Sequence, residues 1–295
     1  MRRIMAVLNA RAGVLLDRDP LQVRHEVEQA LRGAGAEVEV VLGRGRQITR
    51  AIDRAAAAQI DTLIVGGGDG SVSYAAHRLA GTPAVLGVLP LGTLNLLARD
   101  LGMPVDLPDA LAALAAAQPR AIDLASINGR AFHSISGLGF FTQMARAREE
   151  TRDLPTRILR LGAAALRAFT RTGPLTLEID IDGKRRVMRS FALLVTCNRF
   201  GGADWRRDAL DGGTLELHVA EDEGALARIK AGADLVAGVW RDNPGIHSYV
   251  GRSVTVASIR RRLWTATDGE LRREHAPIRY ALAPRALNVL FPPAA

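Results

Sequence analysis

The hydrophobic positions of roughly the first 118 residues predict short strands that alternate with helices. The segment 62–65 is a short apolar run rich in β-branched residues, as in a strand buried on both faces, and 84–89 is a second buried run. Asp19 followed by Pro20 has the chemistry of a helix start. Strands are expected at residues 5–9, 37–42, 62–65 and 84–89, and helices at residues 20–31, 48–59, 72–79, 96–101 and 108–117. This alternation predicts an α/β domain with a doubly wound, mostly parallel sheet.

Beyond residue 118 the apolar positions alternate with polar ones, which is the pattern of half-buried antiparallel strands. The dipeptides Asn128-Gly129 and Asp182-Gly183 interrupt such runs and have the chemistry of tight hairpin turns. We therefore expect a mostly antiparallel β domain, with the boundary near Gln118-Pro119 and domains at residues 1–118 and 119–295. The last apolar segment, residues 286–291, could return to either domain. Further strands are expected at residues 189–197, 214–220, 253–258 and 263–267.

A glycine-rich turn follows the expected strand at residues 62–65. It reads G-G-G-D-G-S over residues 66–71, and a helix with Ser71 near its N-cap is expected after it. Strand, glycine turn and helix N-terminus form a common geometry for holding phosphate. Neither the P-loop pattern nor G-x-G-x-x-G occurs here. On this turn alone, a phosphate site and a tight turn that merely needs glycine are equally supported.

A second turn of the same kind follows the next expected strand. Residues 90–95 read P-L-G-T-L-N and lead into a short helical segment. Two neighbouring parallel strands that each end in a glycine and hydroxyl turn favour a nucleotide at the carboxyl edge of the sheet.

These two motifs resemble the nucleotide-site motifs of the diacylglycerol kinase catalytic-domain family. That family includes soluble bacterial lipid kinases and the sphingosine and ceramide kinases, with NAD kinases as more distant relatives. Ser71 replaces the usual Thr and keeps the hydroxyl, whereas Leu96 replaces a residue that is commonly acidic. The resemblance extends over nearly the whole chain, through the segments 122–124, 132–139, 197–202 and 268–270.

The resemblance implies ATP and Mg²⁺ as cofactors and assigns roles to individual residues. The residues implied to bind the nucleotide are Asn9, Thr49, Gly67, Gly68, Gly70, Ser71, Gly92, Thr93, Asn95 and Glu270. It also implies a turn of the form Asn-x-x-(Ala/Ser)-Gly at residues 9–13.

Four carboxylates are candidates for metal-related or catalytic work. Asp69 sits on a phosphate-binding turn, where Mg²⁺ would offset the charge repulsion, but it could instead hydrogen-bond its own turn. The sequence alone favours an ordinary Asp-Gly hairpin at Asp268, whereas the resemblance implies that Asp268 is the general base for the lipid hydroxyl. A second metal site at Asp208 and Asp211 is implied, although Gly212 stands where the family usually has Asp.

Composition and charge limit the cellular compartments and the binding partners that fit this sequence. The 295 residues carry a net charge of +8, almost wholly from Arg, because Lys184 and Lys230 are the only lysines. The segment 146–171 interleaves Arg with Leu and Ile, which fits either an interfacial surface for anionic lipid or a solvated helix face. Cys197 is the only cysteine, no apolar run reaches transmembrane length, and no nucleic-acid-binding signature occurs.

We therefore expect a cytoplasmic, peripherally membrane-associated lipid kinase that phosphorylates a lipid hydroxyl, either diacylglycerol-like or sphingoid. The alternatives are a soluble-substrate kinase related to NAD kinase, and a nucleotide- or lipid-binding protein of the same fold without catalysis. The expected partner is lipid at an anionic membrane surface and not nucleic acid. A homodimer remains open.

Overall fold

The computed structural model describes residues 3–12, 15, 18–32, 36–151, 155–200 and 205–293. The chain forms two compact units, which we describe separately. Unit 1 consists of residues 1–124 and 284–295, and unit 2 consists of residues 125–283.

Unit 1 is built on a parallel sheet, as the sequence predicts. Its strands are β1 (Arg3–Asn9), β2 (Glu37–Gly43), β3 (Thr62–Gly67), β4 (Val85–Pro90) and the end of β15 (Ile278–Phe291). The order across the sheet is β15-β4-β3-β1-β2, and each of these pairs is parallel. All six residues of β3 are buried, which explains its uninterrupted apolar sequence.

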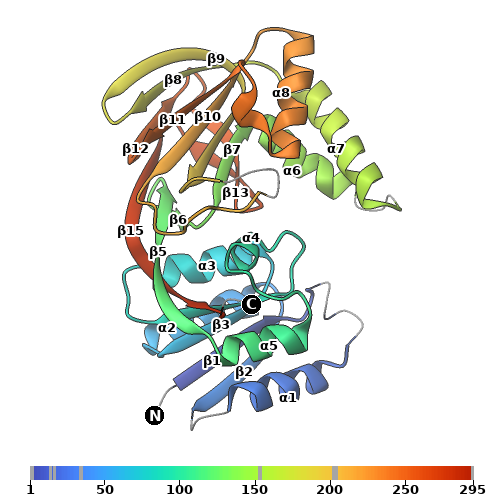
Figure 1. Ribbon diagram of the computed structural model, residues 1–295, viewed down its shortest axis with the longest axis vertical. Coiled ribbons are helices and arrows are strands. Elements are labelled where there is room, and N and C mark those ends of the chain that lie inside the picture. The colour runs from blue at the N-terminus through green and yellow to red at the C-terminus, as the bar shows by residue number, and fades with distance from the viewer. Residues whose placement is uncertain are drawn as a thin grey trace. The chain divides into compact units, whose positions relative to one another are not determined.

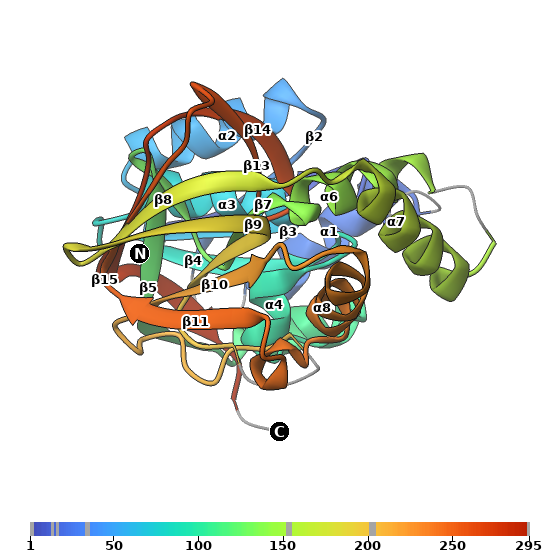
Figure 2. The same cartoon turned by 90° about the horizontal axis from the view of Figure 1, so that it is seen from above.

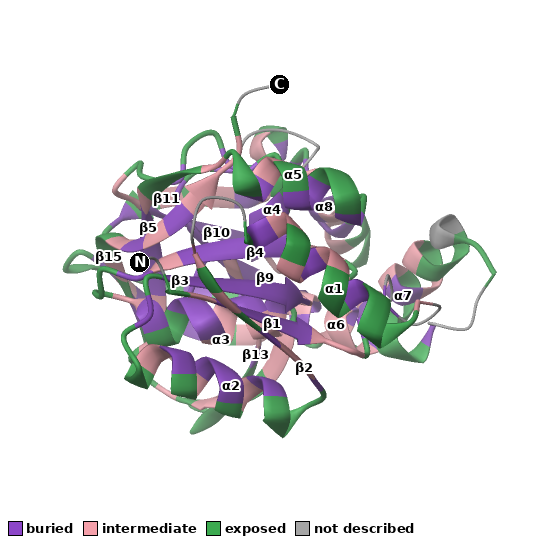
Figure 3. Cartoon of the chain, turned by 90° about the horizontal axis from the view of Figure 1, so that it is seen from below, coloured by how far each residue is buried: buried purple, intermediate pink, exposed green. Residues whose placement is uncertain are grey.

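Helices cover both faces of this sheet (Figure 1). They are α1 (Pro20–Leu31), α2 (Arg46–Ala57), α3 (Asp69–Leu79), α4 (Leu96–Asp100) and α5 (Leu107–Ala115). Helix α1 packs beside α5, and α2 packs beside α3. Each longer helix has one buried stripe and one exposed stripe (Figure 3). The expected cap at Asp19 is confirmed, since its side chain accepts the backbone N–H of Leu21 at 3.1 Å.

Unit 2 is a mostly antiparallel β sandwich with helices gathered at one end (Figure 2). Its central strand β9 (Lys184–Cys197) pairs first with β8 (Leu175–Ile181), then with β10 (Leu215–Glu221) and β7 (Ile135–Gly139). The other strands are β6 (Arg130–Phe132), β11 (Ile246–Gly251), β12 (Ser253–Ala257), β13 (Arg262–Thr267), β14 (Glu270–His275) and the first part of β15.

The helices of unit 2 are α6 (Phe140–Glu150), α7 (Arg157–Arg171), α8 (Ala225–Ala237) and the short 3-10 helix η2 (Trp240–Asp242). They cover an aromatic cluster that includes Phe140, Phe191 and Trp240. The sequence analysis did not predict α8, because its apolar residues do not stand out from the strand-like alternation around it.

Three hairpins of unit 2 turn at an Asx-Gly pair in which both residues have positive φ. They are Asn128-Gly129 (φ 48° and 82°), Asp182-Gly183 (47° and 85°) and Asp268-Gly269 (44° and 83°). The pairs Ile127–Arg130, Ile181–Lys184 and Thr267–Glu270 close the three turns. This is the geometry of a type I′ hairpin, and the two hairpins expected from sequence are confirmed.

The chain passes from unit 1 to unit 2 inside a strand. Strand β5 runs without a break from Gln118 to Ile127, and the division between the units falls inside it, between Leu124 and Ala125, six residues after the expected boundary. The chain returns inside β15, whose first part pairs with β12 and whose last part pairs with β4.

Candidate functional site

The carboxyl ends of the central parallel strands bring the two glycine turns together. Leu8 in β1 lies beside Gly66 in β3, and Gly67 lies beside Pro90 in β4. Asn9 therefore ends at the same edge of the sheet as both turns. Strands β2 and β4 lie on opposite sides of the β1–β3 pair, so this edge is a topological switch point, where α/β sheets bind ligands.

In the first turn the helix starts earlier than the sequence suggests. Gly68 is the N-cap of α3, and Ser71 is the third residue of the helix, so the expectation of Ser71 as the cap is wrong. The backbone N–H of Ser71 donates to the Gly68 carbonyl at 2.9 Å. A Cβ at Gly67 would lie 3.1 Å from the Ser71 hydroxyl oxygen, so a larger residue there would press on Ser71.

Gly68 has no such packing reason. Its φ of −80° is open to any residue. Among the described residues, no heavy atom lies within 4 Å of a Cβ built on it, apart from its chain neighbours. The helix N-terminus beside it presents backbone N–H groups and the positive end of the helix dipole. A glycine that the fold does not require, placed before a helix N-terminus, fits the approach of an anion to the backbone.

The second turn is held by Asn95, which adopts a left-handed conformation with φ 50°. Its side-chain oxygen accepts the backbone N–H of Gly92 at 2.8 Å, and its amide nitrogen donates to the carbonyls of Gly92 and Pro90 at 2.9 Å and 3.2 Å. The side chain of Asn95 thus shapes the turn. Thr93, in the same turn, is exposed.

Asp69 and Gly92 join the two turns. The Asp69 carboxylate accepts the backbone N–H of Leu96 at 2.6 Å and that of Asn95 at 3.1 Å. A Cβ at Gly92 would lie 2.5 Å from the Cα of Gly68, so the two backbones are in direct contact. Asp69 is only 9% exposed, and in this arrangement it caps α4 from the neighbouring turn.

The remaining candidates of unit 1 lie at or near this edge. Thr49 is in the first turn of α2, which follows β2, and its hydroxyl donates to the Arg46 carbonyl at 3.0 Å. The Asn9 side chain accepts the backbone N–H of Arg11 at 3.0 Å. Gly70 lies in the first turn of α3. Gly13, which completes the Asn9 turn of the resemblance, lies outside the described residues.

Asp268 belongs to unit 2, where its carboxylate is engaged with backbone. Oδ2 accepts the N–H of His133 at 2.9 Å, and Oδ1 accepts those of Ser134 and Ile135, both at 3.1 Å. The backbone N–H of Asp268 in turn donates to the Ile135 carbonyl at 2.9 Å. The side chain is 1% exposed. Asp268 therefore fastens its hairpin to the segment before β7.

The other two Asx-Gly hairpins make the same pair of bonds. Asp182 donates its N–H to the Ser253 carbonyl at 3.1 Å and accepts the N–H of Ser253 on Oδ1 at 2.9 Å. Asn128 exchanges such bonds with Arg279, at 2.8 Å and 2.9 Å. A left-handed Asx residue thus extends the pairing of its hairpin to a third strand, and the bonds of Asp268 follow this structural pattern.

The other carboxylate candidates of unit 2 lie at the surface. Glu270 is paired with Arg272 at 3.0 Å, and Asp208 lies 3.6 Å from the Arg199 guanidinium. Asp211 is exposed. Within the described ranges, no three His, Cys, Asp or Glu side chains gather as a metal site would need. The metal roles of Asp69, Asp208 and Asp211 stay predictions, and residues 201–202 of the 197–202 motif lie outside the described residues.

Comparison with known proteins identifies the family. The family model of the diacylglycerol kinase catalytic domain matches residues 3–127, and that of the YegS C-terminal NAD kinase beta sandwich-like domain matches residues 137–291. The chain belongs to the family of diacylglycerol kinases and YegS-like lipid kinases. The resemblance drawn from the motifs and the fold class expected from the sequence are both confirmed.

Individual relatives agree with this assignment. The chain is 30% identical over 213 residues to a diacylglycerol kinase of Bacillus subtilis, covering 68% of this chain and 67% of that one. It is 40% identical over 114 residues to a probable YegS-like lipid kinase of Pseudomonas aeruginosa, covering 38% and 37%. The solved structure of a diacylglycerol kinase from Bacillus anthracis has the same fold, with a TM-score of 0.74 at 19% identity, covering 99% of this chain and 97% of that one.

Gly68 and Gly92 offer a test of the phosphate site. Gly68→Val should still fold but lose about 1 kcal/mol in the free energy of unfolding, because a Cβ there meets open space while Val is a poorer helix N-cap than Gly. Its affinity for ATP should fall about 100-fold or more, because backbone N–H groups lose their approach to phosphate. Titration calorimetry with ATP and urea unfolding measure the two effects.

Gly92→Ala is the matched control. Its methyl group would meet the Gly68 backbone, so the variant should lose about 1–3 kcal/mol of stability from overpacking. If Gly68→Val folds normally and binds ATP as tightly as wild type, the assignment of this turn to phosphate is wrong.

Proposed function

We propose that this lipid kinase transfers the γ-phosphoryl group of ATP to a lipid hydroxyl in the presence of Mg²⁺. The observation that carries the proposal is Gly68, a glycine that neither conformation nor packing requires, at the N-terminus of α3. The open backbone there, next to a second turn in direct contact with it, supports a site for the phosphates of a nucleotide.

The chain's own residues would act mainly by binding and orienting. Backbone N–H groups of the Gly67–Ser71 turn would receive the phosphates, and Ser71 and Thr93 would add hydroxyl groups. Lysine is absent from residues 1–118, so positive charge must come from Arg, helix dipoles or metal. Mg²⁺ would supply charge neutralisation, and the carboxylate oxygens of Asp69, Asp208 and Asp211 are of the type that it prefers.

The acceptor that we propose is a glycerolipid such as diacylglycerol or a sphingoid base. The names of the Bacillus subtilis and Pseudomonas aeruginosa relatives support a lipid acceptor. A soluble acceptor, as in NAD kinases, is the second candidate, and it is favoured only by the name of the matching C-terminal family model.

A transfer assay tests the function. Purified protein, ATP labelled at the γ-phosphate, Mg²⁺ and a total lipid extract should give label in the organic phase, and Gly68→Val should give none. Diacylglycerol and a sphingoid base, added singly to neutral vesicles, then separate the two acceptor classes. Label that appears only on NAD or another soluble compound would refute the lipid acceptor, and no transfer to any acceptor would point to a binding protein.

We also propose Asp268 as the base that takes the proton of the acceptor hydroxyl. The family resemblance supports this role, whereas the hydrogen bonds of Asp268 to three backbone N–H groups give it a structural role as well. A loss of turnover in an Asp268 variant could therefore come from the missing base or from a less stable fold, and the two contributions have to be measured separately. Asp182 allows that separation, because it makes the same bonds at an exposed hairpin.

Asp268→Asn should lower kcat by about 10²–10⁴-fold, the usual contribution of a general base. In this variant the new amide nitrogen, a donor, would face the backbone N–H of His133, which is also a donor. The hydrogen bond between them would be lost, at a cost of about 1–3 kcal/mol of stability. Asp182→Asn keeps Oδ1, which accepts the N–H groups of both Arg252 and Ser253, so it should leave kcat unchanged and cost less stability than Asp268→Asn. The measurements are kcat and urea unfolding for both variants. Near-normal turnover of folded Asp268→Asn would leave Asp268 with the structural role alone.

The surface of α7 supports a further proposal, that the protein binds anionic membranes. Its inner face is buried through Ala164 and Ala168 in the aromatic cluster. Its outer face exposes Leu159 (54%) and Leu166 (67%) one heptad apart, with Arg160 and Arg167 beside them. Exposed leucines flanked by arginines match an interfacial helix. The expected 146–171 surface differs in part. Arg146 stacks on Trp264 at 4.3 Å, and Glu150 pairs with Arg171 at 2.7 Å and with Arg167 at 3.5 Å, at side chains that all remain partly exposed.

No helix in the described part of the chain is long and apolar enough to cross a bilayer.

Binding at the surface can be tested with two double variants of α7. Arg160→Gln/Arg167→Gln should weaken binding to phosphatidylglycerol vesicles about 30-fold, since each basic group near an anionic leaflet is worth about 1 kcal/mol. Binding to neutral vesicles should be unchanged.

Leu159→Ser/Leu166→Ser should weaken binding to both kinds of vesicle, because it removes insertion rather than charge. Vesicle sedimentation at two salt concentrations measures the effects, and salt should weaken only the arginine-dependent part. Equal losses on both vesicle types for the arginine variant would contradict the electrostatic argument.

A further inference from the structure

Arg207 is a buried arginine of unit 2 to which neither the sequence analysis nor the proposed function gives a role. It is 7% exposed, and an antiparallel bridge with Phe200 fixes its backbone. A buried guanidinium is costly unless hydrogen bonds and an opposite charge compensate it. The partners of Arg207 therefore indicate why the fold keeps it.

The guanidinium joins two neighbouring segments through their carbonyl groups. Nη1 donates to the carbonyl of His133, which lies between β6 and β7, and to that of Cys197, the last residue of β9, at 3.4 Å. The backbone N–H of Cys197 in turn donates to the Ser134 carbonyl at 2.8 Å. Arg207 thus fastens residues 133–134 to the end of β9, and these are residues that also bind Asp268.

A single peptide group connects the guanidinium with the Asp268 carboxylate. The oxygen of the peptide bond between His133 and Ser134 accepts the hydrogen bond of Arg207, and the N–H of the same peptide bond donates to Asp268 Oδ1 at 3.1 Å. Hydrogen bonds at the two ends of a peptide group polarise it in the same sense, so each strengthens the other. A positive charge at the oxygen therefore strengthens the hydrogen bond to the carboxylate.

The side chains around this peptide group are all buried. Asp268 is 1% exposed, and the fully buried ring of His133 has its Nε2 atom 3.5 Å from Asp268 Oδ2. Because water screens charges poorly inside a protein, the effect of the Arg207 charge on Asp268 is larger here than it would be at the surface.

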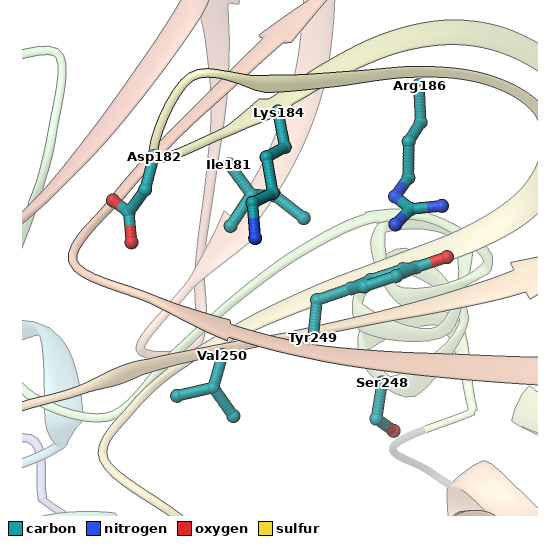
Figure 4. A pocket seen from close by; sticks show the side chains of 7 residues that line it. All are labelled: Ile181, Asp182, Lys184, Arg186, Ser248, Tyr249 and Val250. Atoms are coloured by element: carbon teal, nitrogen blue, oxygen red, sulfur yellow. The ribbon is translucent and has the colours of Figure 1, made fainter.

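Asp182, which makes the corresponding hairpin bonds, shows how much of this arrangement the hairpin itself requires. Its carboxylate accepts backbone N–H groups from Arg252 and Ser253, whereas Asp268 accepts a third one, from His133. Asp182 is exposed and lines a pocket beside the β8–β9 turn (Figure 4). The burial, the third N–H group and the guanidinium at Asp268 thus go beyond the needs of such a turn.

We propose that Arg207 is a positioning residue for Asp268 in the transfer reaction. This proposal rests on the proposed role of Asp268 as the base. By holding the His133–Ser134 peptide group, Arg207 fixes one of the N–H groups that set the direction of the carboxylate. A base must lie within hydrogen-bond reach of the proton that it takes, so a small turn of the carboxylate slows the reaction.

Arg207→Met tests the proposal, because it nearly keeps the length of the side chain and removes its charge and its donors. We expect kcat to fall about 10–100-fold, as when a partner that orients a functional group is lost. The KM for ATP should stay within about twofold, since only the transition state loses an interaction. Arg207→Lys keeps the charge but not the planar donor group, and it should recover most of kcat.

Arg241 supplies a matched control at a distance from Asp268. It is a partly buried arginine of η2 that also donates to a backbone carbonyl, that of Phe200 at 2.8 Å, and to the Glu216 carboxylate at 2.5 Å. Arg241→Met should lose stability in urea unfolding, as Arg207→Met does, but should keep kcat. If both variants lower kcat alike, the loss comes from the fold and the proposal is wrong.

A double variant tests whether Arg207 acts through Asp268. Added to Asp268→Asn, Arg207→Met should lower kcat by no more than about threefold further, because residues that act as a unit are not additive. A full further loss would refute the proposal. If Asp268→Asn loses kcat and folded Arg207→Met does not, only the proposal for Arg207 fails. If Asp268→Asn keeps kcat, the base assignment fails and the role of Arg207 fails with it.

Amide hydrogen exchange, followed by NMR, gives a measurement that does not depend on turnover. The Ser134 N–H should exchange at least about tenfold faster in Arg207→Met than in wild type or Arg241→Met, because its hydrogen bond to Asp268 loses the polarising charge. Unchanged exchange of Ser134 in folded Arg207→Met would show that the guanidinium does not act on this peptide group, and would overturn the proposal.

Discussion

The direct contact of two backbone turns is the constraint on which the candidate nucleotide site depends. Gly92 lies against Gly68 so closely that no Cβ fits between them, and Asp69 holds the contact by accepting two N–H groups from the second turn. One carboxylate thus joins the start of α4 to the start of α3. If Asp69 also has a metal-related role, it performs it from a position fixed by these bonds, which would give any metal ligand a defined orientation.

Asp268 shows how one residue type can serve structure and chemistry with the same geometry. Left-handed Asx residues staple three hairpins to a third strand, and Asn198, with φ 65°, exchanges the same pair of bonds with Thr214. The fold therefore uses this device repeatedly, including at positions to which no function is assigned. A hydrogen-bond pattern alone cannot identify Asp268 as a base, so its role has to be argued from kinetics compared with a structural twin such as Asp182.

The sequence predicted the structure of unit 1 better than that of unit 2. The reason is that the contacts that define unit 2 join residues far apart in the sequence. In unit 1 the strands β1 to β4, the glycine turns and the helices follow one another in sequence, so local pattern was enough for them and for the residues at the edge of the sheet. Helix α3 begins at Asp69 rather than after Ser71, and the place of β15 beside β4 was left open by the sequence. In unit 2 the informative contacts are remote. Asp268 bonds to residues 133–135, and no local signal announces that partner.

The start of β9 marks another limit of prediction from local patterns. In the sequence Lys184-Arg-Arg-Val-Met188 the first four residues are exposed and Met188 is buried, and nothing local says on which face of the strand each side chain lies. Pairing with β8 decides it, because Ile179 and Ile181 lie opposite Arg186 and Lys184. The register is in turn set by the Asp182-Gly183 turn, since a slip of one residue would move every side chain to the other face. The hairpin turn therefore determines which residue of β9 is the first to join the core.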